Sequence, residues 1–264
     1  MTNIIIYSLV LIVAITMTMV GKGGGNFYVV ILAIASIPMH QAATTGQFIL
    51  FSASLAAMFV FHKNKSVSWA LVFLIGSFTS LSALLGGYFS GVFSDYILKM
   101  IFAIMLFISG AIMLIPVKEN KGNLDLKNSF GIIKIKSGDD IYRINLFLAI
   151  PITILTGFAS GMVGVSGGSF LVPLMVVAFG VSMHIAVGTA SSLIMAISLM
   201  GFTGHAIHGD FNPKLAIPLA VVTIVGGIIG GKFALKSKPK NLKKLFAYTN
   251  WFAALFMLYN MFSK

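Results

Sequence analysis

Long apolar stretches, each near the length of a membrane-spanning helix, recur along the whole of this 264-residue chain. A helix needs roughly 20 residues to cross the hydrocarbon core of a bilayer. Eight stretches have about this length: 4–20, 40–61, 67–89, 96–117, 144–163, 183–205, 214–233 and 245–262. Two further apolar runs, 27–37 and 170–181, are about half as long. The pattern predicts an all-α polytopic membrane protein whose first segment stays in the bilayer as a signal anchor.

The composition excludes most soluble classes of protein. Hydrophobic residues make up 58% of the chain and charged residues 9%, and the mean hydropathy is +1.00. Soluble domains are about a quarter charged. The net charge of +12 would suit a nucleic-acid-binding domain, but the basic residues lie in short clusters between apolar stretches, as in multi-spanning membrane proteins. We therefore expect a lipid bilayer, and no nucleic acid, as a partner.

Short motifs of the first half return in the second half. Four of them recur in order at an offset of 143 or 144 residues: those at 24–27, 39–45, 84–89 and 98–102 return at 167–170, 183–189, 228–233 and 242–246. The repeats predict two homologous halves, residues 1–117 and 144–264, joined by a polar connector at 118–143. Within the connector, two β-prone runs flank the turn-forming residues 137–140, which predicts either a small hairpin or a flexible linker.

Positive charge decides between eight and ten crossings. If the two short runs do not cross, the two sides of the membrane carry 10 and 8 of the 18 lysines and arginines; if both cross, the counts become 15 and 3. Cytoplasmic loops carry an excess of positive charge, which favours ten crossings with external termini and a cytoplasmic connector. Five crossings per half invert the second half relative to the first, a common transporter architecture. Eight spans with re-entrant short runs are the alternative.

A glycine cluster precedes each short run. A helix of 11 residues covers only about 16 Å, so each short crossing needs an unwound strand followed by a half-helix that begins near the middle of the membrane. Unpaired backbone N–H groups ahead of a helix form an anion site. The candidate substrate-binding residues around these clusters are Gly23, Gly24, Gly25 and Asn26 in the first half and Gly167, Gly168 and Ser169 in the second.

These residues have two interpretations. Asn26 and Ser169 are predicted to occupy the N-cap positions of the half-helices. The alternative role for the glycines is close helix packing, which small residues permit in membranes. Lys22 adds a cation beside the first cluster only, since Val165 stands at the matching place. It either joins the substrate site or extends to the cytoplasmic surface.

Polar residues follow each half-helix. Thr45 and Thr189 occupy equivalent positions and are further candidates for substrate contact, although threonine also bonds to its own helix backbone. His40, Gln41 and His184 are possible additional contacts, with interfacial packing as the alternative for the histidines. His205, His208 and Asp210 have roughly the spacing of metal ligands, but we expect them to lie in a solvated loop and predict no metal site.

The acidic residues lie outside the middle of every apolar stretch. All six, Asp95, Glu119, Asp125, Asp139, Asp140 and Asp210, fall in or at the edges of loops. A carboxylate at membrane depth usually serves as a cation ligand or a proton relay, so the pattern disfavours a cation pump. The chain also shows no serine–histidine–acid set and no zinc-protease motif, and we expect no enzymatic activity.

Four sequences in the second half resemble one family. They are Gly-Val-Ser-Gly-Gly-Ser-Phe-Leu-Val-Pro-Leu at 164–174, Ala-Val-Gly-Thr-Ala at 186–190, Gly-Asp-Phe-Asn-Pro-Lys-Leu at 209–215 and the glycine-rich 226–231. They look like the TauE/SafE family of membrane transporters, of which the first half carries a degenerate copy. The first half departs from the pattern at Lys22, Asn26 and Val30, where apolar residues or a proline are more usual.

The resemblance implies a plasma-membrane permease for small anions such as sulfite or sulfoacetate, without a cofactor. We therefore expect a secondary transporter that works by alternating access, with coupling to protons or Na⁺ left open. Two hypotheses from other classes are a passive channel for small solutes and a membrane partner protein that transports nothing.

Overall fold

The computed structural model consists almost wholly of helices. It describes residues 2–89, 95–116, 130–137, 140–163, 166–207 and 211–262. The first half forms α1 (Thr2–Met19), α2 (Gly25–Ile34), α3 (Met39–Lys63), α4 (Trp69–Tyr88) and α5 (Asp95–Met113). The second half forms α6 (Leu146–Val163), α7 (Gly168–Pro173), the π-helical turn η1 (Leu174–Ala178), α8 (Met183–Ala206), α9 (Pro213–Lys236) and α10 (Pro239–Phe262). The expected all-α membrane architecture is confirmed.

Four helices within the described ranges are long and apolar enough to cross a membrane: α3, α4, α8 and α9. The shorter apolar helices include α1, α6 and the continuous helix α7–η1, Gly168–Ala178. One boundary differs from the sequence prediction. α10 begins at Pro239 rather than near residue 245, so Lys240, Lys243 and Lys244 lie on its first turns instead of in a loop. Proline suits the first turn of a helix because its missing N–H group has no intrahelical acceptor there.

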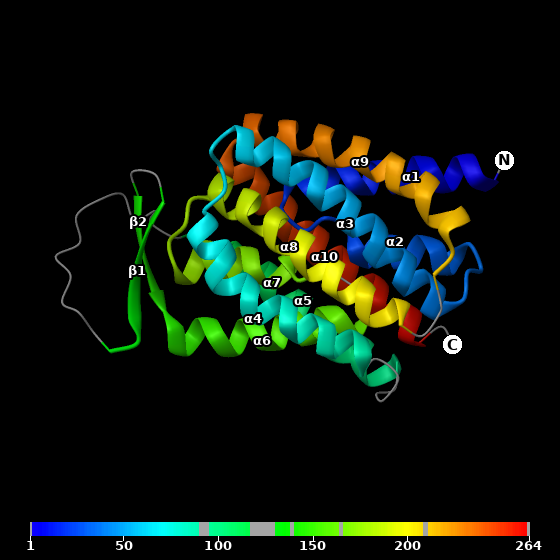
Figure 1. Ribbon diagram of the computed structural model, residues 1–264, viewed down its shortest axis with the longest axis horizontal. Helices are drawn as coiled ribbons and strands as arrows, with labels where there is room; N and C mark the ends of the chain where they lie inside the picture. The colour runs from blue at the N-terminus through cyan, green and yellow to red at the C-terminus, as the bar shows by residue number, and fades with distance from the viewer. Residues whose placement is uncertain are drawn as a thin grey trace.

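The predicted hairpin in the connector is present. β1 (Ile132–Ser137) pairs antiparallel with β2 (Asp140–Asn145), with Ser137 opposite Asp140 at the turn. The hairpin projects beyond one end of the helical bundle, whereas both chain termini lie at the other end (Figure 1). Ile135, Tyr142 and Ile144 are buried and belong to the main hydrophobic core, which fixes the hairpin to the helices.

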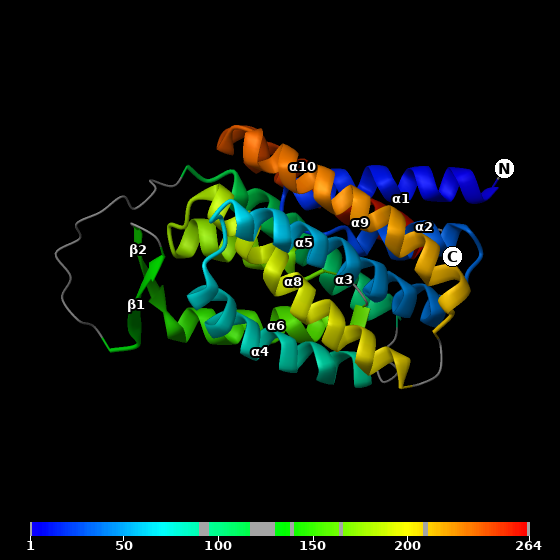
Figure 2. The same cartoon turned by 45° about the horizontal axis from the view of Figure 1, so that its top comes forward.

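Corresponding helices of the two halves run in opposite directions. α1 starts at the end that carries the termini, whereas its counterpart α6 starts at the hairpin end, and both views of the ribbon show this (Figures 1 and 2). The turn between α2 and α3 lies at the same end as the N-terminus, so the directions of α1, α2 and α3 alternate. This geometry is what an inverted repeat requires, and the inverted repeat itself stays a prediction.

The contacts between the halves are reciprocal. α3 packs against α9 as α8 packs against α4, and α1 packs against α9 as α6 packs against α4. α3 and α8 contact each other, as do α5 and α10. Replacing every helix by its counterpart in the other half reproduces this set of contacts. The two halves, whose sequences share repeated motifs, therefore also share a pattern of helix packing.

Glycines away from the breaks serve helix packing. A Cβ atom on Gly161 of α6 would lie 2.0 Å from the carbonyl oxygen of Ala83 on α4. On the other side of the molecule, a Cβ on Gly227 of α9 would lie 2.3 Å from the carbonyl oxygen of Ala53 on α3. Only glycine allows backbones to approach so closely. Close packing thus also occurs at helix glycines outside the two clusters.

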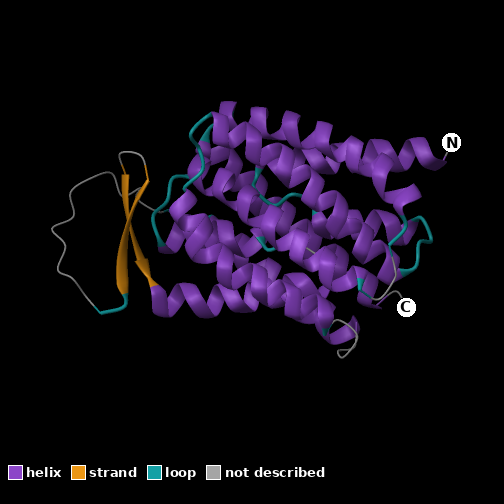
Figure 3. Ribbon diagram, viewed as in Figure 1, coloured by secondary structure: helices purple, strands orange, loops and turns teal. Residues whose placement is uncertain are grey.

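Both predicted interruptions are present inside the bundle. α1 ends at Met19 and α2 begins at Gly25, and α6 ends at Val163 and α7 begins at Gly168. Figure 3 shows short loop segments enclosed by helices at these two places. Gly21, Gly23 and Gly24 have φ values of 73°, 68° and 100°, a region that residues with a Cβ rarely adopt. The first glycine cluster therefore breaks the helix through its backbone geometry.

Candidate functional site

The two breaks meet in the interior of the protein. A Cβ atom on Gly168, the first residue of α7, would lie 2.3 Å from the carbonyl oxygen of Gly21 and 3.0 Å from the Cα atom of Lys22. The absence of a side chain at Gly168 thus lets the start of α7 touch the loop that precedes α2. Loop segments at membrane depth are tolerated only where protein or water surrounds them, and here protein does.

Around this contact lies a narrow polar space between the loops, the two half-helices and α10. It is lined by Met17, Lys22, Gly24, Asn26, Phe27, Ser166, Ser169, Thr249, Asn250 and Ala253. We call it the junction site. Its side chains close in on one another and leave no room for a water molecule. The structure thus gathers one cation, two amides and several hydroxyl groups in a closed space.

Lys22 is the cation of the junction site, and only 3% of its surface is exposed. Its Nζ atom donates to the carbonyl oxygen of Phe246 at 2.8 Å and to Oγ1 of Thr249 at 2.6 Å, both on α10. The interpretation of Lys22 as a surface lysine is wrong, because the glycine loop turns it toward α10. Among the described residues it forms no ion pair, so its charge is compensated by neutral oxygens and a ring face alone.

A hydrogen-bond relay connects α10, α5 and α7. Nδ2 of Asn250 donates to Oγ of Ser109 at 3.0 Å, and that hydroxyl donates to the carbonyl oxygen of Ser169. Asn250 and Ser169 are each 1% exposed. Oδ1 of Asn250, Oγ of Ser169 and Oδ1 of Asn26 are buried without a hydrogen-bond partner. Since buried polar atoms are nearly always bonded, three unpaired oxygens around one space are unusual.

The N-cap prediction for Asn26 and Ser169 is wrong. The N-cap residue of α7 is Gly167, with no side-chain cap, and its carbonyl oxygen accepts from the N–H groups of Phe170 and Leu171. The carbonyl of Gly24 likewise accepts from the two N–H groups that follow Asn26. Both helices therefore begin two residues before the expected place, because the glycines Gly25 and Gly168 are already helical. Asn26 and Ser169 are equivalent second residues of their helices.

Other predicted residues lie outside the junction site. Oγ1 of Thr189 accepts from the N–H of Ser68 at 3.0 Å and so holds the start of α4. Thr45 is fully buried on α3, and its Oγ1 has no partner. A ring nitrogen of His184 lies 2.9 Å from the carbonyl oxygen of Ser237 at the end of α9. These three residues are thus distributed over separate helix contacts.

The remaining candidates are three glycines of the two clusters and two polar residues at the start of α3. Gly23 packs near Leu50 and Ser54 of α3, and Gly167 faces Thr156 of α6, while Gly25 starts α2. Gln41 is half-buried on the first turn of α3. The side chain of His40 lies outside the described residues.

The sequence predicted His205 in a solvated loop, and this prediction is wrong. His205 belongs to α8, is 5% exposed, and has a ring nitrogen 3.0 Å from the carbonyl oxygen of Gly161. The bundle buries it because α8 continues to Ala206 and packs on α6. His208 and Asp210 lie outside the described residues. Within the described residues no three metal-binding side chains come together.

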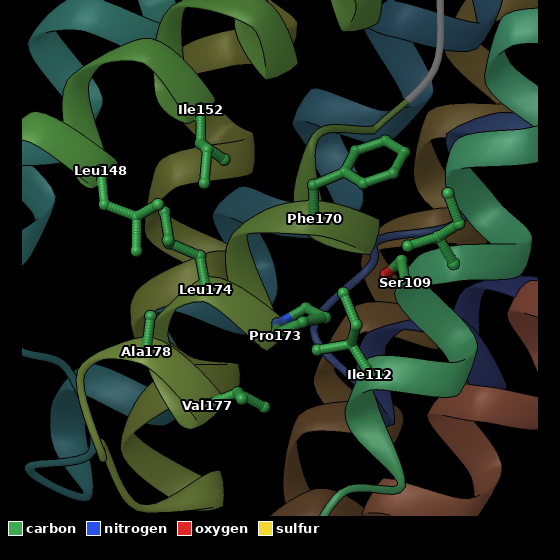
Figure 4. A pocket seen from close by; sticks show the side chains of 10 residues that line it. Ser109, Ile112, Leu148, Ile152, Phe170, Pro173, Leu174, Val177 and Ala178 are labelled. Atoms are coloured by element: carbon green, nitrogen blue, oxygen red, sulfur yellow. The ribbon is translucent and has the colours of Figure 1, made fainter.

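A second cavity adjoins the junction site and is almost entirely apolar. It has a volume of about 250 Å³ and lies between α5, α6 and the helix α7–η1. Figure 4 shows Ile112 and Pro173 near one side of it and Leu148 and Ile152 on the other. Ser109 lines this cavity while its hydroxyl donates to Ser169. The lining suits hydrocarbon groups rather than a charged solute.

Sequence reasoning missed Ser109, Ser166, Thr249 and Asn250. Asn250 could have been found, because a lone amide inside an apolar stretch is expensive in a membrane and marks a functional position. The matching position of the first half is the buried Leu106, so the internal repeat gave no support. The two serines resemble the many serines that bond to their own helix backbone.

Comparisons with known proteins agree with this architecture. The family model described as "Sulfite exporter TauE/SafE" matches residues 6–257. The probable membrane transporter protein YunE of Bacillus subtilis is 25% identical over 92% of each chain. The probable membrane transporter protein MJ0441 of Methanocaldococcus jannaschii is 27% identical over 94% of this chain and 92% of its own length. No solved structure matches this chain with significance.

Proposed function

Because the chain belongs to the sulfite exporter TauE/SafE family, we propose that this membrane transporter carries a small anion, sulfite or an organosulfonate such as sulfoacetate. It acts as a secondary transporter by alternating access, with no catalytic step. The protein is located in the cell membrane, and the connector hairpin faces the cytoplasm.

The observation that carries this proposal is the environment of Lys22. A charged amine buried among neutral groups is costly unless a counter-charge is nearby. Within the described part of the chain that counter-charge is missing, and the lysine lies where the two broken helices meet. A bound anion supplies the counter-charge, so the lysine stabilises the loaded site more than the empty one.

Backbone groups support the same assignment. The first N–H groups of α2 and α7–η1 have no acceptor within their own helices, and the helix dipoles place partial positive charge there. Both helix starts border the junction site through Gly24, Asn26, Ser166 and Ser169. An oxyanion in this space accepts from these amides, from the hydroxyl of Ser169 and from Lys22.

The arrangement of the halves supports alternating access. The junction site is closed in this conformation, so a substrate enters or leaves only if the helices around it move. The reciprocal packing of the two halves supports a second, related arrangement of the same contacts, so that the site opens to each side in turn. Since the chain contains no cysteine, single cysteines introduced at Lys134 and Lys214 report the orientation: a membrane-impermeant label reaches Lys134→Cys from the cytoplasm and Lys214→Cys from outside.

Reconstitution into liposomes tests the function. We expect sulfite uptake that saturates with concentration and that stops when Gly168 is replaced by valine, with membrane insertion intact. Uptake that rises linearly with concentration would indicate a passive channel. Intact, correctly folded protein that moves neither sulfite nor sulfoacetate would contradict transport of this class of anion.

A further inference from the structure

The relay through Ser109 fixes the orientation of the Asn250 amide. A serine hydroxyl has a single proton, and that of Ser109 is donated to the carbonyl oxygen of Ser169. Its bond to Asn250 at 3.0 Å must then be accepted from an N–H, so Nδ2 of Asn250 faces Ser109. Oδ1 is therefore directed away from the relay. The hydrogen bonds of Ser109 thus determine the positions of Nδ2 and Oδ1 in this amide.

The amide oxygen of Asn250 takes no part in the relay and accepts no hydrogen bond. Oδ1 of Asn250 is buried and unpaired, and Asn250 lines the junction site. Asn26 lines the same site and also has a buried, unpaired Oδ1. A buried acceptor is destabilising until a donor reaches it. No water molecule fits beside these oxygens in the closed site, so the donor must arrive with the ligand.

An anion with acceptor oxygens alone, such as sulfite, binds this site less tightly than an anion that also carries a donor. The lone pairs of sulfite would bond to Lys22 and the backbone amides, but they would repel the oxygens of Asn250 and Asn26. A ligand that carries a hydroxyl or amino group beside its anionic group satisfies both sets. Sites built to hydrogen-bond a hydroxyl discriminate strongly against an analogue that lacks it.

We infer that the site prefers anions that also carry a hydrogen-bond donor over sulfite and other anions without one, and that Asn250, held by Ser109, is the residue that selects for the donor. This inference rests on the proposed anion site and adds to it a substrate class: small sulfonates or related oxyanions with a hydroxyl or amino group. It also assigns Ser109 as a positioning residue, because its one proton is committed to Ser169.

Two sulfonates that differ by one hydroxyl test the inference. The affinities of ethanesulfonate and 2-hydroxyethanesulfonate for the purified full-length protein are measured by isothermal titration calorimetry. We expect the hydroxyl-bearing anion to bind at least about tenfold more tightly. Equal affinities would overturn the inference but leave the anion site standing, since water would then enter with the ligand. Binding of neither anion would overturn the anion site and the inference together.

Variants locate the discrimination. Asn250→Leu places at this position the residue that the first half carries at Leu106, and we expect it to bring the affinity ratio close to one. Ser109→Ala frees the amide to rotate and should lower the ratio. The matched control is Ser198→Ala, another buried helix serine, whose hydroxyl bonds to Ile194 of its own helix. An unchanged ratio in both Asn250→Leu and Ser109→Ala would contradict the assignment; if Asn250→Leu does not fold, Ser109→Ala and the wild-type comparison decide.

Discussion

Lys22 and Phe246, which lie 224 residues apart in the chain, are joined twice. Nζ of Lys22 donates to the carbonyl oxygen of Phe246 at 2.8 Å and lies 4.1 Å from the centre of its aromatic ring. The face of an aromatic ring attracts a cation, more strongly when both are removed from water. The second half of the molecule thus holds the charge that the first half contributes, so movement of α10 relative to the α1–α2 loop would release or capture it.

Removing the charge of Lys22 should stabilise the protein without ligand. Methionine fills a similar volume, and replacing buried ionic groups by well-packed apolar ones is often stabilising. We expect Lys22→Met to raise the free energy of unfolding by about 1 kcal/mol or more, measured by chemical denaturation in detergent. Thr249→Val, which removes one acceptor and keeps the charge, is the control and should be destabilising. A destabilised Lys22→Met would show that the lysine is held for structural reasons.

Neighbouring glycines at the start of α7 should respond differently to alanine. A Cβ on Gly168 would meet the carbonyl oxygen of Gly21 at 2.3 Å, a backbone atom that cannot move aside alone. A Cβ on Gly167 would meet only side-chain methyl groups, the nearest that of Thr156 at 3.2 Å, and the φ of Gly167, −69°, is ordinary. We therefore expect Gly168→Ala to lower sulfite uptake by tenfold or more and Gly167→Ala by less than threefold. Similar losses in both would contradict a close contact between the two breaks.

The apolar cavity beside α7–η1 gives that helix room to move. Val177 borders the cavity, so a larger side chain there fills the free volume. We expect Val177→Phe to slow sulfite transport several-fold while the affinity for sulfite stays the same. Val221→Phe on the exposed face of α9 is the matched control, because Val221 is 58% exposed and does not line the cavity. Wild-type rates in Val177→Phe would show that the cavity plays no part in the transport cycle.

Much of the fold was predictable because it rests on local rules. Apolar length predicted the helices, and the turn residues at 137–140 indicated a hairpin as one of two alternatives, the other being a flexible linker. The break before α2 was predictable because Gly21, Gly23 and Gly24 adopt positive φ values that other residues avoid. These features depend on neighbouring residues or on the thickness of the bilayer. A sequence shows the first directly and the second through the length of its apolar stretches.

The composition of the site was less predictable because it depends on long-range contacts. Lys22 meets α10 only after the whole chain has folded, and a surface lysine has the same sequence context. Asn250 and Ser109 look like isolated polar residues in apolar helices, and their connection spans 141 residues. Thr189 was expected near the substrate because it matches Thr45, and its hydroxyl oxygen accepts a bond from the N–H of Ser68, a contact that the sequence did not indicate. Matching positions in the two halves therefore predict that two residues lie at equivalent places in the fold, but they do not predict the hydrogen-bond partner of each residue.

The central claim is that an anion binds where Lys22 and the two broken helices meet. The most direct test is sulfite-dependent thermal stabilisation of the purified protein, since a ligand that binds the folded state raises its apparent stability. We predict a rise in melting temperature that saturates with sulfite in the wild type and disappears in folded Lys22→Met. An equal rise in both proteins would place the anion elsewhere and contradict the account.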